Sequence, residues 1–164
     1  MLREGNRLGA EDYNKGGYLA VNFLRNREST QDLDYSLEPK WAHDNDVRGS
    51  LHRAMVRGTL FEEAEKQNLV LWEGSHLRVL VLLEWALEQK LRRIHNGMQS
   101  SKRGTDINDA LALLRHLKMR NGGLLEREYI RTLDICSTEM VPDHGTMDEI
   151  AATYGKKYYE EAFA

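Results

Sequence analysis

The chain has 164 residues, with 23 Lys and Arg against 26 Asp and Glu and a formal net charge of −3. This length fits one domain with a core of its own, and the near balance of charge argues against broad nucleic-acid binding, which needs a clustered basic field. The single cysteine, Cys136, excludes an intrachain disulfide and a thiolate metal cage. The longest apolar run, Val79 to Leu83, is far below the ~20 residues of a membrane span, so we expect no membrane contact and a cytoplasmic location.

The first part of the chain predicts short elements around a small sheet. Residues 1–15 are polar and contain glycine, and we expect them to be loosely ordered. An apolar run after Gly16-Gly17 favours a short helix that ends near Leu24. Alternation of apolar and polar residues then predicts a half-buried strand, ended by Pro39, with the apolar positions Leu33, Tyr35 and Leu37.

The next segment predicts one helix and two strands. Residues 44–64 favour a helix with a break at Gly58. Asn68 to Trp72 and Leu77 to Val81 are apolar runs on either side of a short polar loop, which is typical of a β-hairpin.

Four helices are predicted after Val81. The first carries leucines at helical spacing and stops at Asn96-Gly97, and the second begins with Thr105 as its cap and ends at Asn121-Gly122. A short helix is expected over 126–133, and Thr146 with Glu149 forms a capping-box pattern that starts the last one. The predicted class is α+β (mixed α/β), as a single domain over 1–164 with its sheet in 16–82 and a helical part over 83–164.

Asp32 and Asp34 are the first candidate for a functional site. They lie two apart on a predicted strand, so their side chains share one face. Two carboxylates at that distance repel one another unless a cation neutralises them, and Mg²⁺ is suited to such a pair when a substrate phosphate completes its shell. Two solvated aspartates at a strand edge are the plain alternative.

The surroundings of this pair resemble the opening of nucleotidyltransferase-fold proteins of the abortive-infection toxin (AbiEii-like) and MNT-type antitoxin group. The resemblance implies Mg²⁺ at Asp32 and Asp34, and glycines that let the backbone approach a triphosphate at a helix N-terminus. The residues in register are Gly16, Gly17, Arg27, Thr30, Asp32 and Asp34.

Two later motifs fit the same group, so the resemblance runs from Gly16 to Leu117. Lys90 stands in an E-x-K-L run, where the resemblance implies a catalytic lysine that contacts nucleotide phosphate. Asp106 and Asp109 follow basic residues at a helix start, and the resemblance implies that they bind substrate. A solvated Lys90, and two acids that complement the helix dipole, are the alternatives.

The chain departs from the family pattern in three ways. A serine that normally contacts the γ-phosphate is replaced by Gly17-Tyr18. A third carboxylate normally comes from a later strand, but Leu69 to Trp72 is wholly apolar and Glu73 lies just past its end. The connection from Leu37 to Asn68 is also short for this fold. These departures favour a degenerate active site.

The sequence therefore leaves three hypotheses for the function, and it leaves open whether the chain is an enzyme. The first is a nucleotidyltransferase-like protein, reduced or repurposed, that binds a nucleotide with Mg²⁺ or a related small molecule. The second is a non-catalytic binding or regulatory protein on that scaffold, with a protein partner or a second copy of itself. The third is an enzyme in which acid–base residues act on a small organic molecule.

Overall fold

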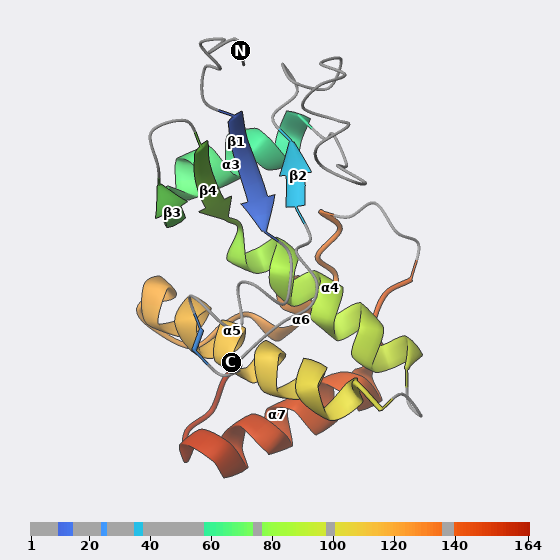
Figure 1. Cartoon of the computed structure of the whole chain (residues 1–164). Helices are drawn as coiled ribbons and strands as arrows, with labels where there is room; N and C mark the ends of the chain where they lie inside the picture. The colour runs from blue at the N-terminus through green and yellow to red at the C-terminus, as the bar shows by residue number, and fades with distance from the viewer. Residues whose placement is uncertain are drawn as a thin grey trace, which may run out of the picture. The chain divides into compact units, whose positions relative to one another are not determined.

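The computed structural model describes residues 10–14, 24–25, 35–37, 58–73, 77–97, 101–135 and 140–164. The chain divides into two compact units, one made of Met1–Phe23 and Ser29–Leu82, the other of Leu24–Glu28 and Leu83–Ala164. Among the described residues, the first unit contains strands and the helix α3, and the second contains helices (Figure 1). The described chain is thus a helix-rich mixture of helices and strands. The two units divide after Leu82, where the sheet-containing part was expected to end. A single domain over the whole chain stays a prediction.

The first unit contains a four-stranded sheet of order β2-β1-β4-β3. The central strand β1 runs antiparallel to β2 and parallel to β4, and β3 runs antiparallel to β4. The bounds of the strands are Ala10–Asn14 for β1, Tyr35–Leu37 for β2, Leu69–Glu73 for β3 and Leu77–Val81 for β4.

Strand β1 occupies residues for which the sequence predicted only a loosely ordered segment. Ala10–Asn14 contains no β-branched residue and one aromatic, so its own propensity does not favour a strand. The strand is instead stabilised by pairing on both of its sides, because Asp12 pairs with Leu37 on one side and with Val79 on the other. Pairing with distant strands therefore decides this element.

The predicted strand pair after residue 68 is confirmed as β3 and β4. Before it, helix α3 runs from Gly58 to Gln67, so the helix begins at the glycine where a break was expected. Ala64 is fully buried, and its carbonyl oxygen accepts a 2.9 Å hydrogen bond from the backbone N–H of Asn68. Residues 44–57, which were expected to form the earlier part of this helix, lie outside the described residues.

The described part of the second unit contains all four predicted helices. Helix α5 contacts both α4 and α7, and α4 also contacts α6 and α7. Their bounds are Leu83–Asn96 for α4, Arg103–Asn121 for α5, Arg127–Arg131 for α6 and His144–Tyr158 for α7. Large side chains from these helices form a core, among them the fully buried Trp85, Leu87, Leu91, Ile94, Leu111 and Tyr154.

Two predicted helix starts are wrong by about one turn. Helix α5 begins at Arg103, so Thr105 lies inside its first turn and Lys102 takes the N-cap position without a side-chain cap. Helix α7 is capped by Asp143, whose Oδ1 accepts the Thr146 N–H at 2.7 Å. A carboxylate at the N-cap satisfies a free N–H and complements the helix dipole, so α7 starts before the predicted capping box.

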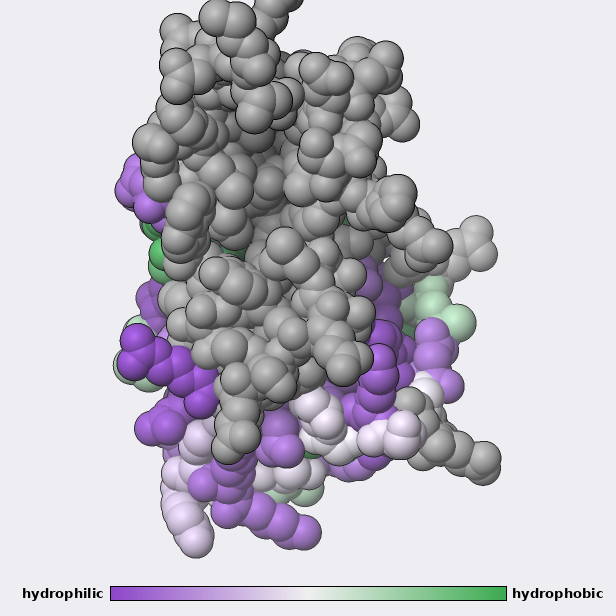
Figure 2. Space-filling model, in the orientation of Figure 1, coloured by the Kyte–Doolittle hydropathy of each residue, from purple (hydrophilic) through white to green (hydrophobic). Residues whose placement is uncertain are grey.

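Polar side chains make up most of the described surface on the face drawn in Figure 2. In the view of Figure 2, the coloured side chains are mainly hydrophilic, with small apolar patches between them. Large apolar side chains that are exposed include Met119, Leu124, Tyr129, Met140 and Tyr159. Within the described residues, every helix is too short or too polar to cross a membrane.

Candidate functional site

Two pairs of charged residues face each other where α4 and α5 meet. Lys90 and Arg93 are three apart on α4, and Asp106 and Asp109 are three apart on α5, so each pair shares one side of its helix. The basic pair approaches the end of α4 and the acidic pair follows the start of α5. A short connection therefore brings the two pairs to the same place.

These four residues, the Lys90 cluster, are joined by three ion pairs. The Nζ of Lys90 lies 3.0 Å from Oδ1 of Asp106 and 2.5 Å from Oδ2 of Asp109. The Nη2 of Arg93 lies 3.0 Å from the same Oδ1 of Asp106. One carboxylate oxygen thus accepts from two different cations, one on each of two successive turns of α4.

Burial divides the cluster into an inner and an outer part. The side chains of Lys90 and Asp109 are 3% and 1% exposed, whereas Asp106 is 11% and Arg93 47% exposed. Charges removed from water require partners, and here two cations meet two anions, so the formal charge of the cluster is zero. The alternative of a solvated Lys90 is excluded by its burial.

The geometry limits what the cluster can do chemically. An ammonium group has three N–H donors, and the two carboxylates take two of those on Lys90. A phosphate oxygen would have to accept the third N–H of Lys90. The substrate that carries this phosphate would have to reach a nitrogen that is buried. Asp106 and Asp109 are bound to cations of the protein, so neither presents a free carboxylate to a metal ion.

A second buried ion pair on α4 was not singled out from the sequence. The Nε of Arg92 donates to Oε1 of Glu88 at 2.8 Å, and its Nη2 donates to the carbonyl oxygen of Leu133 at 2.7 Å. The other oxygen of Glu88 accepts the backbone N–H of Ile135 at 2.9 Å. Arg92 thus holds the segment after α6 against α4. The spacing of four residues between acid and base was the available signal.

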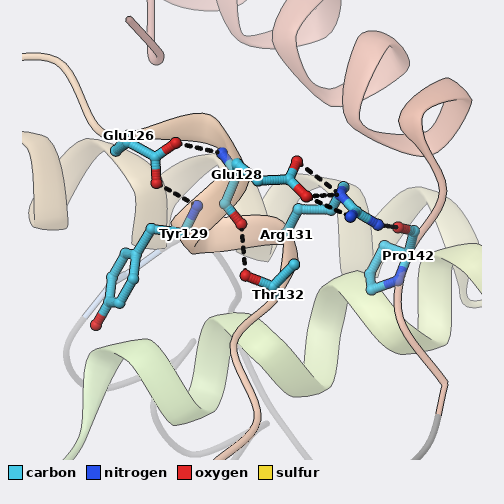
Figure 3. A network of polar contacts seen from close by, with 6 residues as sticks. All are labelled: Glu126, Glu128, Tyr129, Arg131, Thr132 and Pro142. Carbon is cyan, nitrogen blue, oxygen red and sulfur yellow. Dashed lines mark hydrogen bonds and ion pairs between the residues drawn. The ribbon is translucent and has the colours of Figure 1, made fainter.

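A cleft of about 450 Å³ lies in the second unit among α4, α5 and α6, with a lining that is partly apolar and partly polar. Its rim carries the exposed ring of Tyr129, which points away from the polar contacts around α6 in Figure 3. There Glu126 caps α6 by accepting backbone N–H groups, and Arg131 bridges Glu128 to the carbonyl oxygen of Pro142. The remaining lining residues include Glu84, Leu117, Arg120, Leu124 and Ile130.

The predicted metal site falls outside the described part of the chain. This holds for all six residues of the first motif, namely Gly16, Gly17, Arg27, Thr30, Asp32 and Asp34. Their roles, and Mg²⁺ as a cofactor, stay predictions. Among the residues that the structure does describe, no group of three or more His, Cys, Asp or Glu side chains is placed to hold a metal ion.

Comparison with known proteins gives no relative. No protein-family model matches the chain, and neither a curated protein nor a solved structure is similar enough to match it. The case for a function therefore depends on the residues themselves.

Proposed function

We propose that this chain is a nucleotidyltransferase-like protein that binds a nucleotide with Mg²⁺, or a related small phosphate compound, at a reduced or repurposed active site. The observation that carries the proposal is the contact of Lys90 with both Asp106 and Asp109. All three residues belong to the sequence motifs that resemble the nucleotidyltransferase group.

The contact supports the proposal because the sequence did not require it. Lys90 is separated from Asp106 by 16 positions and from Asp109 by 19. If the three residues were unrelated surface groups, α5 would place its acids on any of several sides. Instead both acids meet the one lysine, as residues of a common site do.

The proposed chemistry assigns a role to each group. Asp32 and Asp34 would hold Mg²⁺, which orients a triphosphate and offsets charge on the moving phosphorus centre. Lys90 would supply positive charge to the phosphates, and its contacts with Asp106 and Asp109 fix the direction of its amine. A hydroxyl group of an acceptor would then attack the α-phosphorus, with pyrophosphate as the leaving group and the hydroxyl proton passing to water.

A second candidate is a non-catalytic binding protein on the same scaffold. The observation in its favour is that the Lys90 ammonium group is buried and paired with two carboxylates. A network of that kind also serves to fix two helices in register. In this case the cluster joins α4 to α5 and the ligand-binding function lies elsewhere, for which the cleft beside Tyr129 is available.

Calorimetric titration separates the two candidates. The four nucleoside triphosphates are titrated with Mg²⁺ into the parent protein, into the double variant Asp32→Asn/Asp34→Asn, and into the control Lys156→Met, which alters an exposed lysine of α7. The first candidate requires heat of binding in the parent and the control, and its loss in the double variant. Absence of heat with all four nucleotides would reject it and leave the non-catalytic scaffold.

A further inference from the structure

Arg93 lies at the junction of α4 and α5. Unlike the other cations there, its side chain is half exposed to water and is also paired with a buried carboxylate. Its side chain is 47% exposed, while one of its nitrogens, Nη2, lies 3.0 Å from Oδ1 of Asp106. Asp106 is itself fixed from the inside by Lys90, which binds the same oxygen. The guanidinium group is therefore directed by a buried carboxylate and still reaches water.

The neighbouring basic side chains are already committed. Arg92 is 7% exposed and is bound to Glu88 and to the carbonyl oxygen of Leu133. Arg103 forms a two-pronged pair with Glu149, with nitrogen–oxygen distances of 2.6 and 2.5 Å. Lys90 is buried. Of these four cations, Arg93 is the one that an anion from solvent reaches without breaking a buried contact.

A guanidinium group can hold two acceptors at once. It carries five N–H donors in a planar fork, so one edge can bind Asp106 while another binds a phosphate in a two-pronged manner. An arginine that is already oriented loses less conformational entropy when it binds a ligand than one that moves freely. Asp106 thus acts as a positioning residue for Arg93.

We propose that Arg93 binds the polyphosphate of the nucleotide, bridging it to Asp106 at the outer edge of the Lys90 cluster. This inference rests on the proposed function and adds to it the residue that recognises phosphate from solvent. The inference also predicts that the dependence of binding on Arg93 follows the negative charge of the ligand. Nucleoside triphosphates and inorganic tripolyphosphate depend on Arg93, whereas an uncharged nucleoside does not.

The test is a set of binding titrations with three ligands in the presence of Mg²⁺: a nucleoside triphosphate, inorganic tripolyphosphate and the matching nucleoside. The proteins are the parent, Arg93→Ala, Arg93→Lys and the control Arg127→Ala. Arg127 is matched because it is also a partly exposed arginine of the second unit, paired with Asp148 at 2.7 Å.

Arg93→Ala is expected to weaken binding of both polyphosphate ligands about tenfold or more, because a charge-assisted contact to the anion is removed. Its affinity for the nucleoside is expected to stay at the parent value, and Arg93→Lys should recover part of the loss. Arg127→Ala should bind all three ligands as the parent does. A melting curve of each variant shows that it is folded, which the exposure of Arg93 favours.

Three results would reject the assignment of Arg93, and they can be told apart. If the parent binds the triphosphate and Arg93→Ala binds it equally well, the assignment of Arg93 is wrong and the proposed function stands. If the parent binds no nucleotide and no tripolyphosphate, the proposed function is wrong and the assignment of Arg93 is lost with it. Equal weakening by Arg93→Ala and Arg127→Ala would reduce the effect to general surface charge, which also rejects the assignment.

Discussion

The ammonium nitrogen of Lys90 lies 2.5 Å from Oδ2 of Asp109, and both side chains are almost completely shielded from water. A buried pair of this kind adds little net stability compared with well-packed apolar residues, because desolvation offsets the attraction. Breaking it by removing one partner has a large cost, since the other charge is left alone in the interior. This asymmetry makes the cluster testable by stability measurements.

Lys90→Met is expected to lower the free energy of unfolding by about 3–5 kcal/mol, because Asp106 and Asp109 lose the cation between them. Urea denaturation of the variant and the parent measures the change. Lys156→Met, at an exposed position, is the matched control, with an expected change within ~0.5 kcal/mol. A small effect of Lys90→Met would contradict the burial of the ion pairs.

Replacing Lys90 and both of its carboxylate partners by apolar residues should restore the stability that the single substitution removes. The triple variant Lys90→Met/Asp106→Leu/Asp109→Leu leaves no uncompensated charge in the interior, so its free energy of unfolding is expected within about 1–2 kcal/mol of the parent. The same denaturation experiment measures it. If the cluster serves a phosphate ligand, this stable variant also loses nucleotide binding. If it serves only to fasten α4 to α5, ligand binding survives.

Asp143 gives the second unit part of its sensitivity to acid. The Thr146 N–H that donates to its side chain holds the pKa of Asp143 below the ordinary value of 3.8, and the nearby His95 and His144 act in the same direction. A carboxyl group with a depressed pKa stabilises the fold above the unfolded pKa, and this contribution is lost as the pH falls through the folded pKa.

We therefore expect the stability difference between the parent and Asp143→Asn to shrink steadily below about pH 4. Asparagine caps a helix about as well as aspartate but does not titrate, so the neutral-pH structure should be kept. Thermal melting between pH 2.5 and 7 measures the difference. A difference that stays constant over this range would show that folding does not lower the pKa of Asp143.

Gly122 and Gly104 form a matched pair at the two ends of α5. Gly122 has φ 71°, in the left-handed region, and an added Cβ at either glycine would meet nothing within 4 Å. Gly122→Ala is expected to lower the free energy of unfolding by about 1 kcal/mol, because only the backbone is strained. Gly104→Ala, inside the first turn, should raise it by about 0.5–1 kcal/mol. Opposite signs in denaturation curves are the expected result, and equal signs would contradict the end of α5 at Gly122.

Helices with a regular apolar stripe could be predicted from the sequence, and strands without one could not. The spacing of Leu83, Leu87 and Leu91 was sufficient to place α4, because the helical period of an apolar stripe is a local property of the sequence. For β1 the sequence favoured no strand at all. Its existence depends on hydrogen bonds to β2 and β4, which are distant in the chain.

Helix ends were less predictable than helix positions. Gly122 was expected to end α5 and does so, because a left-handed backbone strongly favours glycine. The starts of α5 and α7 were misplaced, since several residues in each region can cap a helix. Asp143 rather than Thr146 caps α7. The position of the cap depends on the geometry of the loop before the helix, which the preferences of single residues do not describe.

For the candidate site, the sequence by itself determined that Lys90, Asp106 and Asp109 stand out by motif and that each pair of charges shares one side of a helix. Only the tertiary structure decided that the two sides meet, that Lys90 is buried between the acids, and that Arg93 remains in reach of solvent. The physical reason is that side-chain direction follows from local helical geometry. Burial and pairing, in contrast, depend on which helix packs opposite, and that is settled by the core of the whole unit.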